Sequence, residues 1–260
     1  MREANLERAT SEIPLFPSGN VLPFVLVTAL FFLWGIPNNL NDVLIRQFMK
    51  SFAITRFQAG LIQSAFYMGY FVLAVPAALI MRRLGYKAGF IIGLVLFGAG
   101  AFLFWPAAIV GRYWFFLVAL FVIASGLSFL ETASNPFIAQ CGDAQTSERR
   151  LNFSQAFNPI GSIAGVLVGT IFIFSGIELT PQQVLAMQAS GQYAAYLQLE
   201  TLRVVRPYVV LGIIAFLWAV LIARTEFPRV RGDPILFRRR EGVKSLSEAR
   251  ESKGGPMATL

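Results

Sequence analysis

Six apolar runs, each long enough to cross a lipid bilayer, constrain this chain more than any other feature. An α-helix needs about 18 to 20 apolar residues to cross roughly 30 Å of hydrocarbon. The runs of this length are Val21 to Ile45, Gln58 to Arg82, Ala88 to Ile109, Tyr113 to Ala139, Phe153 to Ser175 and Pro207 to Ala223. Because 56% of the 260 residues are hydrophobic and 14% are charged, lipid is the main solvent of such a chain. The sequence predicts an all-α membrane protein with six transmembrane helices.

The basic residues are distributed unevenly between the two sides of this topology. With the N-terminus inside, sixteen Lys and Arg residues lie on the inner side, nine of them after Ala223, and six lie on the outer side. The outer six are Arg46, Lys50, Arg56, Arg112, Arg203 and Arg206. The bias follows the positive-inside rule, although the outer group from Arg46 to Arg56 runs against it. We therefore expect both termini to be cytoplasmic, the inner membrane as location, and no nucleic-acid partner for the net charge of +8.

Composition divides the chain into three parts. Residues 1–20 are polar and mixed in charge, which predicts a cytoplasmic N-terminal tail. Residues 21–223 hold the six-helix transmembrane bundle, and residues 224–260 are basic and without apolar periodicity, which predicts a disordered cytoplasmic tail. Four of the five connections between helices are short. The exception, residues 176–206, is predicted to form a partly amphipathic outer cap in which Thr180 caps a helix that starts with Pro181.

The cysteine and histidine content excludes most enzymatic chemistry. Cys141 is the only cysteine, so no disulfide forms within the chain, and its location predicts a small buried residue. The chain has no histidine, which excludes Ser-His and Cys-His catalysis and a rhomboid-like intramembrane hydrolase. A presenilin-like hydrolase would need two paired aspartates within neighbouring helices, and only Asp42 is available. We expect no enzyme, no metal site and no cofactor other than a proton that serves as coupling ion.

Two acidic residues lie within the apolar runs. A charged side chain at the centre of a transmembrane helix costs about 2.5–3.5 kcal/mol on insertion scales, so such acids face a cavity or a partner. Asp42 shares a helix face with Asn38, and Glu131 shares one with Ser128 and Asn135, at offsets of three and four residues. Burial in a medium of low dielectric favours the neutral form of a carboxyl group, which suits a proton carrier.

The fifth helix adds a third polar face, formed by Asn152, Gln155 and Asn158. Amide side chains supply both donors and acceptors, as the hydroxyl groups of a sugar require. Five aromatic residues are candidates for packing against the apolar face of a sugar, although most aromatic residues in membrane helices serve packing: Trp34, Phe66, Tyr67, Tyr70 and Trp105. Two alternatives stay open at this point. Asp42 can form an interfacial ion pair with Arg46, and the amide stripe can serve hydrogen bonding between helices without touching substrate.

The polar clusters also suggest an internal repeat. One cluster, Asn38 to Asp42, lies on the first helix, and the other, Ser128 to Asn135, lies on the fourth. These two helices are the first members of two successive helix triplets. This arrangement resembles the two inverted three-helix repeats within each half of a major-facilitator transporter.

Five sequence blocks resemble one branch of that superfamily, the fucose-proton symporters. They are Phe31 to Trp34, Asn38 to Asp42, Gln58 to Tyr67, Leu130 to Phe137 and Gln155 to Asn158. The resemblance extends from about Phe24 to Pro228 in helix order and loop length. It implies proton-coupled transport of L-fucose or a related hexose such as galactose or glucose, with Asp42 and Glu131 as proton-coupling acids. It further implies that Asn39, Glu131, Gln155 and Asn158 contact sugar, beside Asn38 and Asn135 from the polar faces.

The resemblance covers one six-helix bundle, whereas members of that family have two. We therefore expect the N-terminal half of such a transporter, with a sugar and membrane lipid as partners and either a second six-helix half or a second copy completing the cavity. The alternative is a non-transporting fragment or membrane partner that assembles through its polar face. Arg46 departs from the family, where we expect an uncharged residue beside the first-helix acid.

Overall fold

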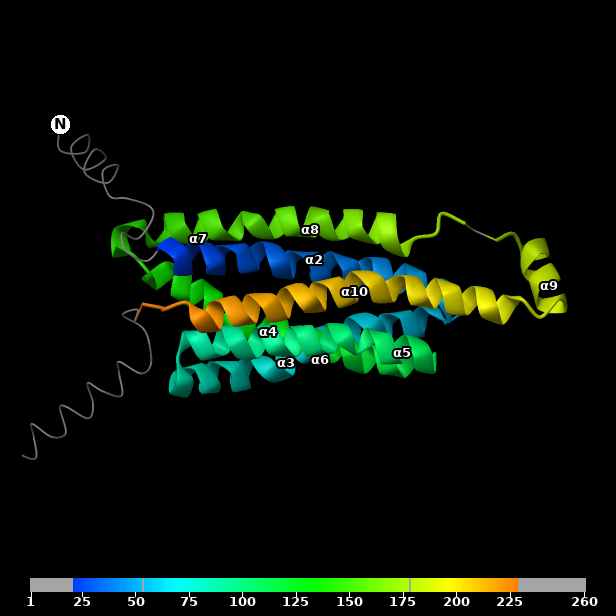
Figure 1. The fold of residues 1–260 in the computed structure, drawn as a ribbon, viewed down its shortest axis with the longest axis horizontal. Coiled ribbons are helices and arrows are strands. Elements are labelled where there is room, and N and C mark those ends of the chain that lie inside the picture. The colour runs from blue at the N-terminus through cyan, green and yellow to red at the C-terminus, as the bar shows by residue number, and fades with distance from the viewer. Residues whose placement is uncertain (1–20, 53, 178, 229–260) are drawn as a thin grey trace, which may run out of the picture.

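Six long apolar helices run side by side in a computed structural model, which describes residues 21–52, 54–177 and 179–228 (Figure 1). The predicted tails at residues 1–20 and beyond 228 lie outside the described residues. The elements are α2 (Val21–Ser51), α3 (Arg56–Leu84), α4 (Tyr86–Phe102), α5 (Phe104–Val110), α6 (Tyr113–Gln140), η1 (Ala144–Thr146), α7 (Ser147–Gln155), α8 (Phe157–Val168), η2 (Gly169–Ile173), α9 (Pro181–Ala189) and α10 (Tyr193–Arg224). The predicted class, an all-α membrane protein with six transmembrane helices, is confirmed.

Proline residues explain where two of the spans are interrupted. Proline lacks a backbone N–H, and its ring clashes with the carbonyl of the residue four positions earlier. For Pro106 the carbonyl in question is that of Phe102, where α4 ends before α5. For Pro159 it is that of Gln155, where α7 ends before α8. The third span is therefore α4 with α5, and the fifth is η1, α7, α8 and the π-helical turn η2. At the N-terminal end of the second span, Thr55 forms a capping box with Gln58, so α3 has a defined start.

The packing is organised around α2 and α6, which are the central helices. Of their apolar stretches, 67% and 61% are buried, against 22% for α3 and 22% for the fifth span. The pair of first and fifth spans (α2 on α8) corresponds to the pair of fourth and second spans (α6 on α3). Likewise, the pair of sixth and first spans (α10 on α2) corresponds to the pair of third and fourth spans (α4 on α6). The third span also packs on the sixth (α4 on α10). Exchanging first with fourth, second with fifth and third with sixth preserves this contact pattern, as two inverted three-helix repeats require.

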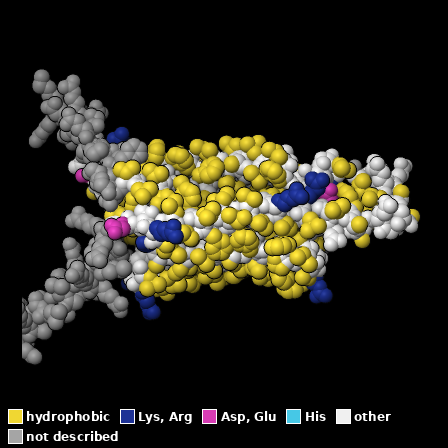
Figure 2. All heavy atoms as spheres, viewed as in Figure 1, with side chains coloured by type: hydrophobic (Ala, Val, Ile, Leu, Met, Phe, Trp, Pro, Cys, Tyr) yellow, Lys and Arg dark blue, Asp and Glu magenta, His cyan; other side chains and the backbone are white. Residues whose placement is uncertain are grey.

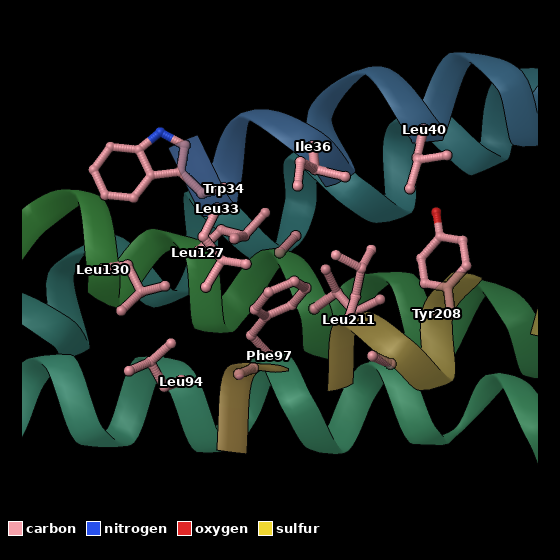
Figure 3. Close-up of a cluster of buried hydrophobic side chains, with 14 of the residues drawn as sticks. Leu33, Trp34, Ile36, Leu40, Leu94, Phe97, Leu127, Leu130, Tyr208 and Leu211 are labelled. Atoms are coloured by element: carbon pink, nitrogen blue, oxygen red, sulfur yellow. The ribbon is translucent and has the colours of Figure 1, made fainter. Parts of the chain in front are cut away.

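The core between these helices is almost wholly apolar (Figure 3). Trp34 of α2, Phe97 of α4 and Leu127 of α6 are buried there, and Leu211 of α10 packs into the same cluster. Tyr208 of α10 stacks on Phe104 of α5, with ring centroids 3.8 Å apart and planes 3° from parallel. The outer surface carries hydrophobic side chains over the length of the helices, with Lys and Arg residues mainly toward the two ends (Figure 2). This distribution is typical of a membrane-spanning bundle.

Glycine residues allow α2 and α8 to approach closely along their lengths. A Cβ atom added at Gly161 or Gly165 of α8 would collide with the carbonyl oxygens of Phe32 or Ile36 in α2. Across the same interface, a Cβ at Gly35 would collide with the carbonyl of Asn158. Small residues let membrane helices gain dispersion energy from backbone contact, because lipid provides no hydrophobic force between them. The fifth span, which carries Gln155 at the end of α7 and Asn158 at the start of α8, is thus fixed on α2.

The sixth span begins at Tyr193, well before Pro207, where the sequence placed its start. The stretch before Pro207, which includes Glu200, Arg203 and Arg206, was instead predicted to belong to the partly amphipathic outer cap. The structure pairs the first of them, because Glu200 is 3% exposed and lies 3.3 Å from Lys50 and 3.8 Å from Arg203. Gln47 Nε2 also donates to Glu200 at 2.9 Å. Lys50, which belongs to the basic group that departs from the positive-inside rule in the predicted topology, is therefore partly neutralised by a buried acid.

We expect Gly161→Ala to destabilise the bundle by about 1–3 kcal/mol, because the added methyl group must displace the backbone of α2. Gly60→Ala is the matched control, since a Cβ there meets nothing within 4 Å and helix propensity alone favours Ala by about 0.5–1 kcal/mol. Thermal unfolding of the purified variants in detergent measures both effects. Equal melting temperatures for the two variants would contradict the close packing of α2 on α8.

Candidate functional site

The predicted polar residues lie on α2, α6, α7 and α8. Asp42 and Glu131 are both exposed at the surface of the bundle, whereas Asn38, Asn39 and Asn135 are half-buried. An acid that sits in a membrane helix and is not covered by its own bundle needs a cavity or a partner on that side. The polar face is consequently a surface of this bundle, and not an enclosed pocket within it.

Asp42 is held by a hydrogen-bonded amide from the neighbouring helix. Gln63 Nε2 of α3 donates to Asp42 Oδ1 at 2.8 Å. Gln63 Oε1 in turn accepts from Asn41 Nδ2, also at 2.8 Å, and Asn41 is 1% exposed. The alternative ion pair between Asp42 and Arg46 does not form within 4.0 Å in the described part of the chain, where the charged pairs join Lys50 and Arg203 to Glu200.

A second contact set joins α2, α3 and α6 around Tyr70. Its hydroxyl group donates to Asn38 Oδ1 at 3.5 Å, a long hydrogen bond. The backbone carbonyl of Tyr70 accepts from Ser128 Oγ at 3.2 Å. Tyr70 therefore connects the polar face of the first helix with that of the fourth.

The third contact set joins α6 to the fifth span. Gln155 Nε2 donates to Asn135 Oδ1 at 3.3 Å, and Asn135 Nδ2 donates to the backbone carbonyl of Glu131 at 3.3 Å. The Glu131 carboxylate itself has no hydrogen bond or ion pair with the described residues. It is therefore free to bind a proton or a ligand at the surface of the bundle.

The side chain of Asn158 lies on the polar face and also forms a hydrogen bond to a neighbouring helix. Its Nδ2 donates to the carbonyl of Phe31 in α2 at 3.4 Å, at the interface where glycine residues bring α2 and α8 together. The half-buried Asn39 lies beside Asn38 on α2. The structure thus brings Asn38, Asn135, Gln155 and both acids to one side of the bundle, and it places Asn158 partly within a helix interface.

Comparison with known proteins decides the family. Residues 23–256 match the Major Facilitator Superfamily. The chain belongs to this superfamily. The superfamily's two-repeat bundle agrees with the contact pattern among the six spans.

The most similar proteins found include sugar transporters. The chain is 47% identical to an L-fucose-proton symporter of Escherichia coli over 213 residues, 82% of this chain and 49% of the relative. It is 40% identical to the L-fucose-proton symporter of Haemophilus influenzae, over 81% of this chain and 50% of the relative. A glucose/galactose transporter of Brucella abortus is 34% identical over 83% of this chain and 49% of the relative. The chain spans about half the length of the curated relatives it matches, as one six-helix half would.

Solved structures give the same result. A crystal structure of the Escherichia coli fucose:proton symporter matches with a TM-score of 0.70 and 46% identity, covering 82% of this chain and 51% of that chain. A structure of a superfamily transporter in the outward conformation matches with a TM-score of 0.71 and 47% identity over the same shares. The predicted resemblance to fucose-proton symporters is confirmed, and the relatives are transporters, not enzymes.

The five aromatic candidates differ in how far they are buried. Trp34 and Phe66 are buried in the core, at 4% and 3% exposure, so they serve packing. Tyr67 and Trp105 are exposed, and Trp105 lies on α5, in the C-terminal part of the third span. Tyr70 alone among the five bonds to a predicted site residue.

Sequence reasoning did not assign a role to Gln63, whose amide contacts both Asn41 and Asp42. Gln63 lies within one of the resembling blocks, but polar faces were predicted only for the first, fourth and fifth helices. A helical-wheel comparison between α2 and α3 could not find it, because the register between two helices is set by packing and not by either sequence.

Arg150 was counted among the inner-side charges, and the structure shows that it is fully buried. Its guanidinium group donates to the carbonyls of Ile138 (3.3 Å) and Ala139 (2.8 Å) and to Thr146 Oγ1. The last carbonyls of a helix have no partner within it, so Arg150 of α7 supplies the missing donors of α6. This contact fixes the helix of Asn135 relative to the helix of Gln155.

We expect Arg150→Ala to destabilise the bundle by at least about 2–3 kcal/mol, because hydrogen bonds from a charged donor contribute about 1.5–3 kcal/mol each and buried carbonyls would be left unpaired. The neighbouring Arg149 is exposed, so Arg149→Ala is the matched control and should leave stability within about 0.5 kcal/mol. Urea or thermal unfolding in detergent measures the difference. Similar stability of the two variants would show that Arg150 does not cap α6.

Proposed function

We propose that this chain forms one six-helix half of a proton-coupled sugar transporter, with L-fucose or a related hexose such as galactose or glucose as substrate. The observation that carries the proposal is the gathering of two uncovered membrane acids and three amides, Asn38, Asn135 and Gln155, on one side of a bundle that is 47% identical to an L-fucose-proton symporter. Amides can donate to and accept from sugar hydroxyl groups, while a carboxyl group can take up and release a proton.

Asp42 and Glu131 have different surroundings, which supports different roles in this proposal. Asp42 is bonded to Gln63 and is the proton carrier of the first helix. Glu131 has a free carboxylate within one turn of Asn135, which is bonded to Gln155. Glu131 would therefore couple protonation to sugar recognition, with the amides of Asn135 and Gln155 beside it as sugar contacts.

Asn38, Asn39 and Asn158 complete the proposed sugar contacts. Asn38 shares a helix face with Asp42, and Asn39 lies beside it on the same helix. The amide of Asn158 reaches the backbone of α2 at 3.4 Å, so its sugar contact would use the remaining lone pairs and hydrogens of that amide.

The uncovered acids require a partner surface in the membrane. Exposed carboxylates facing lipid would carry the insertion cost of a charged side chain, whereas a facing bundle would enclose them in a polar cavity at the bilayer middle. A second six-helix half or a second copy of this chain fits this requirement. Alternating access then consists of the two bundles rocking around the shared cavity.

A non-transporting role is the alternative function. In that case the same polar face would serve only assembly with another membrane protein, and the acids would be buried in the interface. The two functions differ in whether a sugar competes for the polar face.

We expect proton-driven uptake of L-fucose by the full chain in liposomes to fall to the level of empty liposomes in Asp42→Asn and in Glu131→Gln. Each substitution keeps the shape of the side chain and removes its ability to carry a proton. Radiolabelled sugar uptake under an imposed pH gradient is the measurement, with galactose and glucose in parallel, and Glu148→Gln at the exposed inner end is the matched control.

Two results would contradict the transport proposal. Full uptake in both variants would exclude the acids from the mechanism. Absence of uptake and of sugar binding in the folded wild type, together with a constant complex on native electrophoresis, would favour the assembly role.

We propose that both termini face the cytoplasm of the inner membrane. The first residues of α2 and the last residues of α10 lie at the same end of the bundle, and α9 lies at the opposite end (Figure 1). In a Cys141→Ser background, a cysteine at Gln188 of α9 should react with an impermeant maleimide in intact cells, and a cysteine at Glu148 should react only after lysis. The reverse labelling pattern would invert the topology.

A further inference from the structure

Asp42 is bonded through a chain of amides that ends in a buried polar atom without a partner. The three side chains are Asn41, Gln63 and Asp42, which we call the amide chain. Donation runs from Asn41 Nδ2 to Gln63 Oε1 and from Gln63 Nε2 to Asp42 Oδ1, with 2.8 Å at both contacts. Asn41 Oδ1 is buried and accepts no hydrogen bond from the described residues.

The charge of Asp42 determines the direction of this donation. An ionised carboxylate only accepts hydrogen bonds, so Gln63 must present its NH₂ group to Asp42. Its carbonyl oxygen then faces Asn41, which must present its own NH₂ group. A reversed amide at either position would place two oxygens against each other, so both amides are held in one orientation.

A proton on Asp42 Oδ1 removes this constraint. The new O–H group can donate to Gln63 Oε1 once the amide of Gln63 has turned, and Gln63 Nε2 can then donate to Asn41 Oδ1 once that amide has turned as well. Each direction leaves one polar group of Asn41 without a partner, so the amides themselves favour neither direction strongly. The protonation state of Asp42 is the deciding difference between the two arrangements.

Resting on the proposed role of Asp42 as proton carrier, we propose that Gln63 is its positioning residue and that the amide chain reverses its direction of donation when Asp42 takes up a proton. No covalent bond changes except the O–H bond formed on Asp42. The buried Asn41 thereby transmits the protonation state from the polar face into the interface of α2 with α3. Gln63 acts through Asp42 and needs no contact with sugar.

The other charged and titratable side chains around this part of α2 do not replace Gln63. They are Arg46 on α2, Tyr67 and Tyr70 on α3, Glu131 on α6 and the Glu200–Arg203 pair on α10. None of them is joined to the Asp42 carboxylate by a hydrogen bond or ion pair in the ranges that the structure describes. Tyr70 bonds to Asn38, and Glu200 bonds to Gln47 and Lys50.

Infrared difference spectroscopy on the purified full chain in lipid nanodiscs tests the proposal without requiring transport. A pH jump gives the C=O band of each carboxyl group that takes up a proton, and the band lost in Asp42→Asn belongs to Asp42. Carbon-13 labelling of the glutamine side-chain carbonyl gives the band of Gln63, identified by its loss in Gln63→Leu. Gln58→Leu is the matched control on the same helix, since Gln58 bonds to Thr55 and not to Asp42.

We expect the Asp42 band to move to higher wavenumber in Gln63→Leu, because the acid loses its hydrogen-bond partner, and to stay in place in Gln58→Leu. The Gln63 carbonyl band should shift on the pH jump in the wild type and not in Asp42→Asn. Circular dichroism establishes that the variants are folded, and Gln63→Met, which keeps the length of the side chain and adds no titratable group, serves as the test if the leucine variant does not fold.

An Asp42 band that is unchanged in folded Gln63 variants would overturn the positioning role and leave the transport proposal intact. A Gln63 band that is insensitive to the pH jump would overturn the reversal. If no band is lost in Asp42→Asn, Asp42 takes up no proton, which overturns the proton-carrier role in the proposed function and the amide-chain proposal with it.

Discussion

Inside the hydrocarbon of a bilayer no water is available to polar groups, so every amide, hydroxyl and carboxyl group on the six helices depends on protein partners. The structure meets this requirement in different ways along the length of the bundle. At one end of the bundle a buried glutamate is surrounded by Gln47, Lys50 and Arg203. At the opposite end Arg150 supplies donors to the last carbonyls of α6. Between these two ends, the Glu131 carboxylate has no hydrogen bond or ion pair with the described residues, and this unmet requirement supports the role that we propose for the polar face.

The glycine contacts between α2 and α8 are the packing counterpart of this polar arrangement. They bring the two backbones so close that Asn158 can reach the carbonyl of Phe31, and they fix the position of Gln155 relative to α6. The corresponding approach on the other side of the pseudo-symmetric bundle occurs at Gly69, where an added Cβ would lie 2.6 Å from the carbonyl of Phe121. A transporter bundle needs such rigid pairs, because it moves as a body around its cavity.

Much of the architecture could be predicted because hydrocarbon thickness converts directly into run length. Six spans and the candidate acids Asp42 and Glu131 followed from that rule and from the cost of charge in lipid. The start of the sixth helix did not follow, because the helix-prone stretch that holds Glu200 and Arg203 was predicted to form a separate cap. The burial of Arg150 did not follow either, since a sequence does not show which charges find partners.

The sequence by itself determined the class of the protein, the number of spans and the residues that form polar stripes, since helix periodicity depends only on local geometry. Only the tertiary structure decided that Gln63 of α3 bonds to Asp42, that Asp42 does not pair with Arg46, and that Trp34 lies in the core. These facts depend on how each helix is rotated and shifted against its neighbours. Side-chain volumes and glycine contacts along the whole interface set that register, and no single helix contains the information.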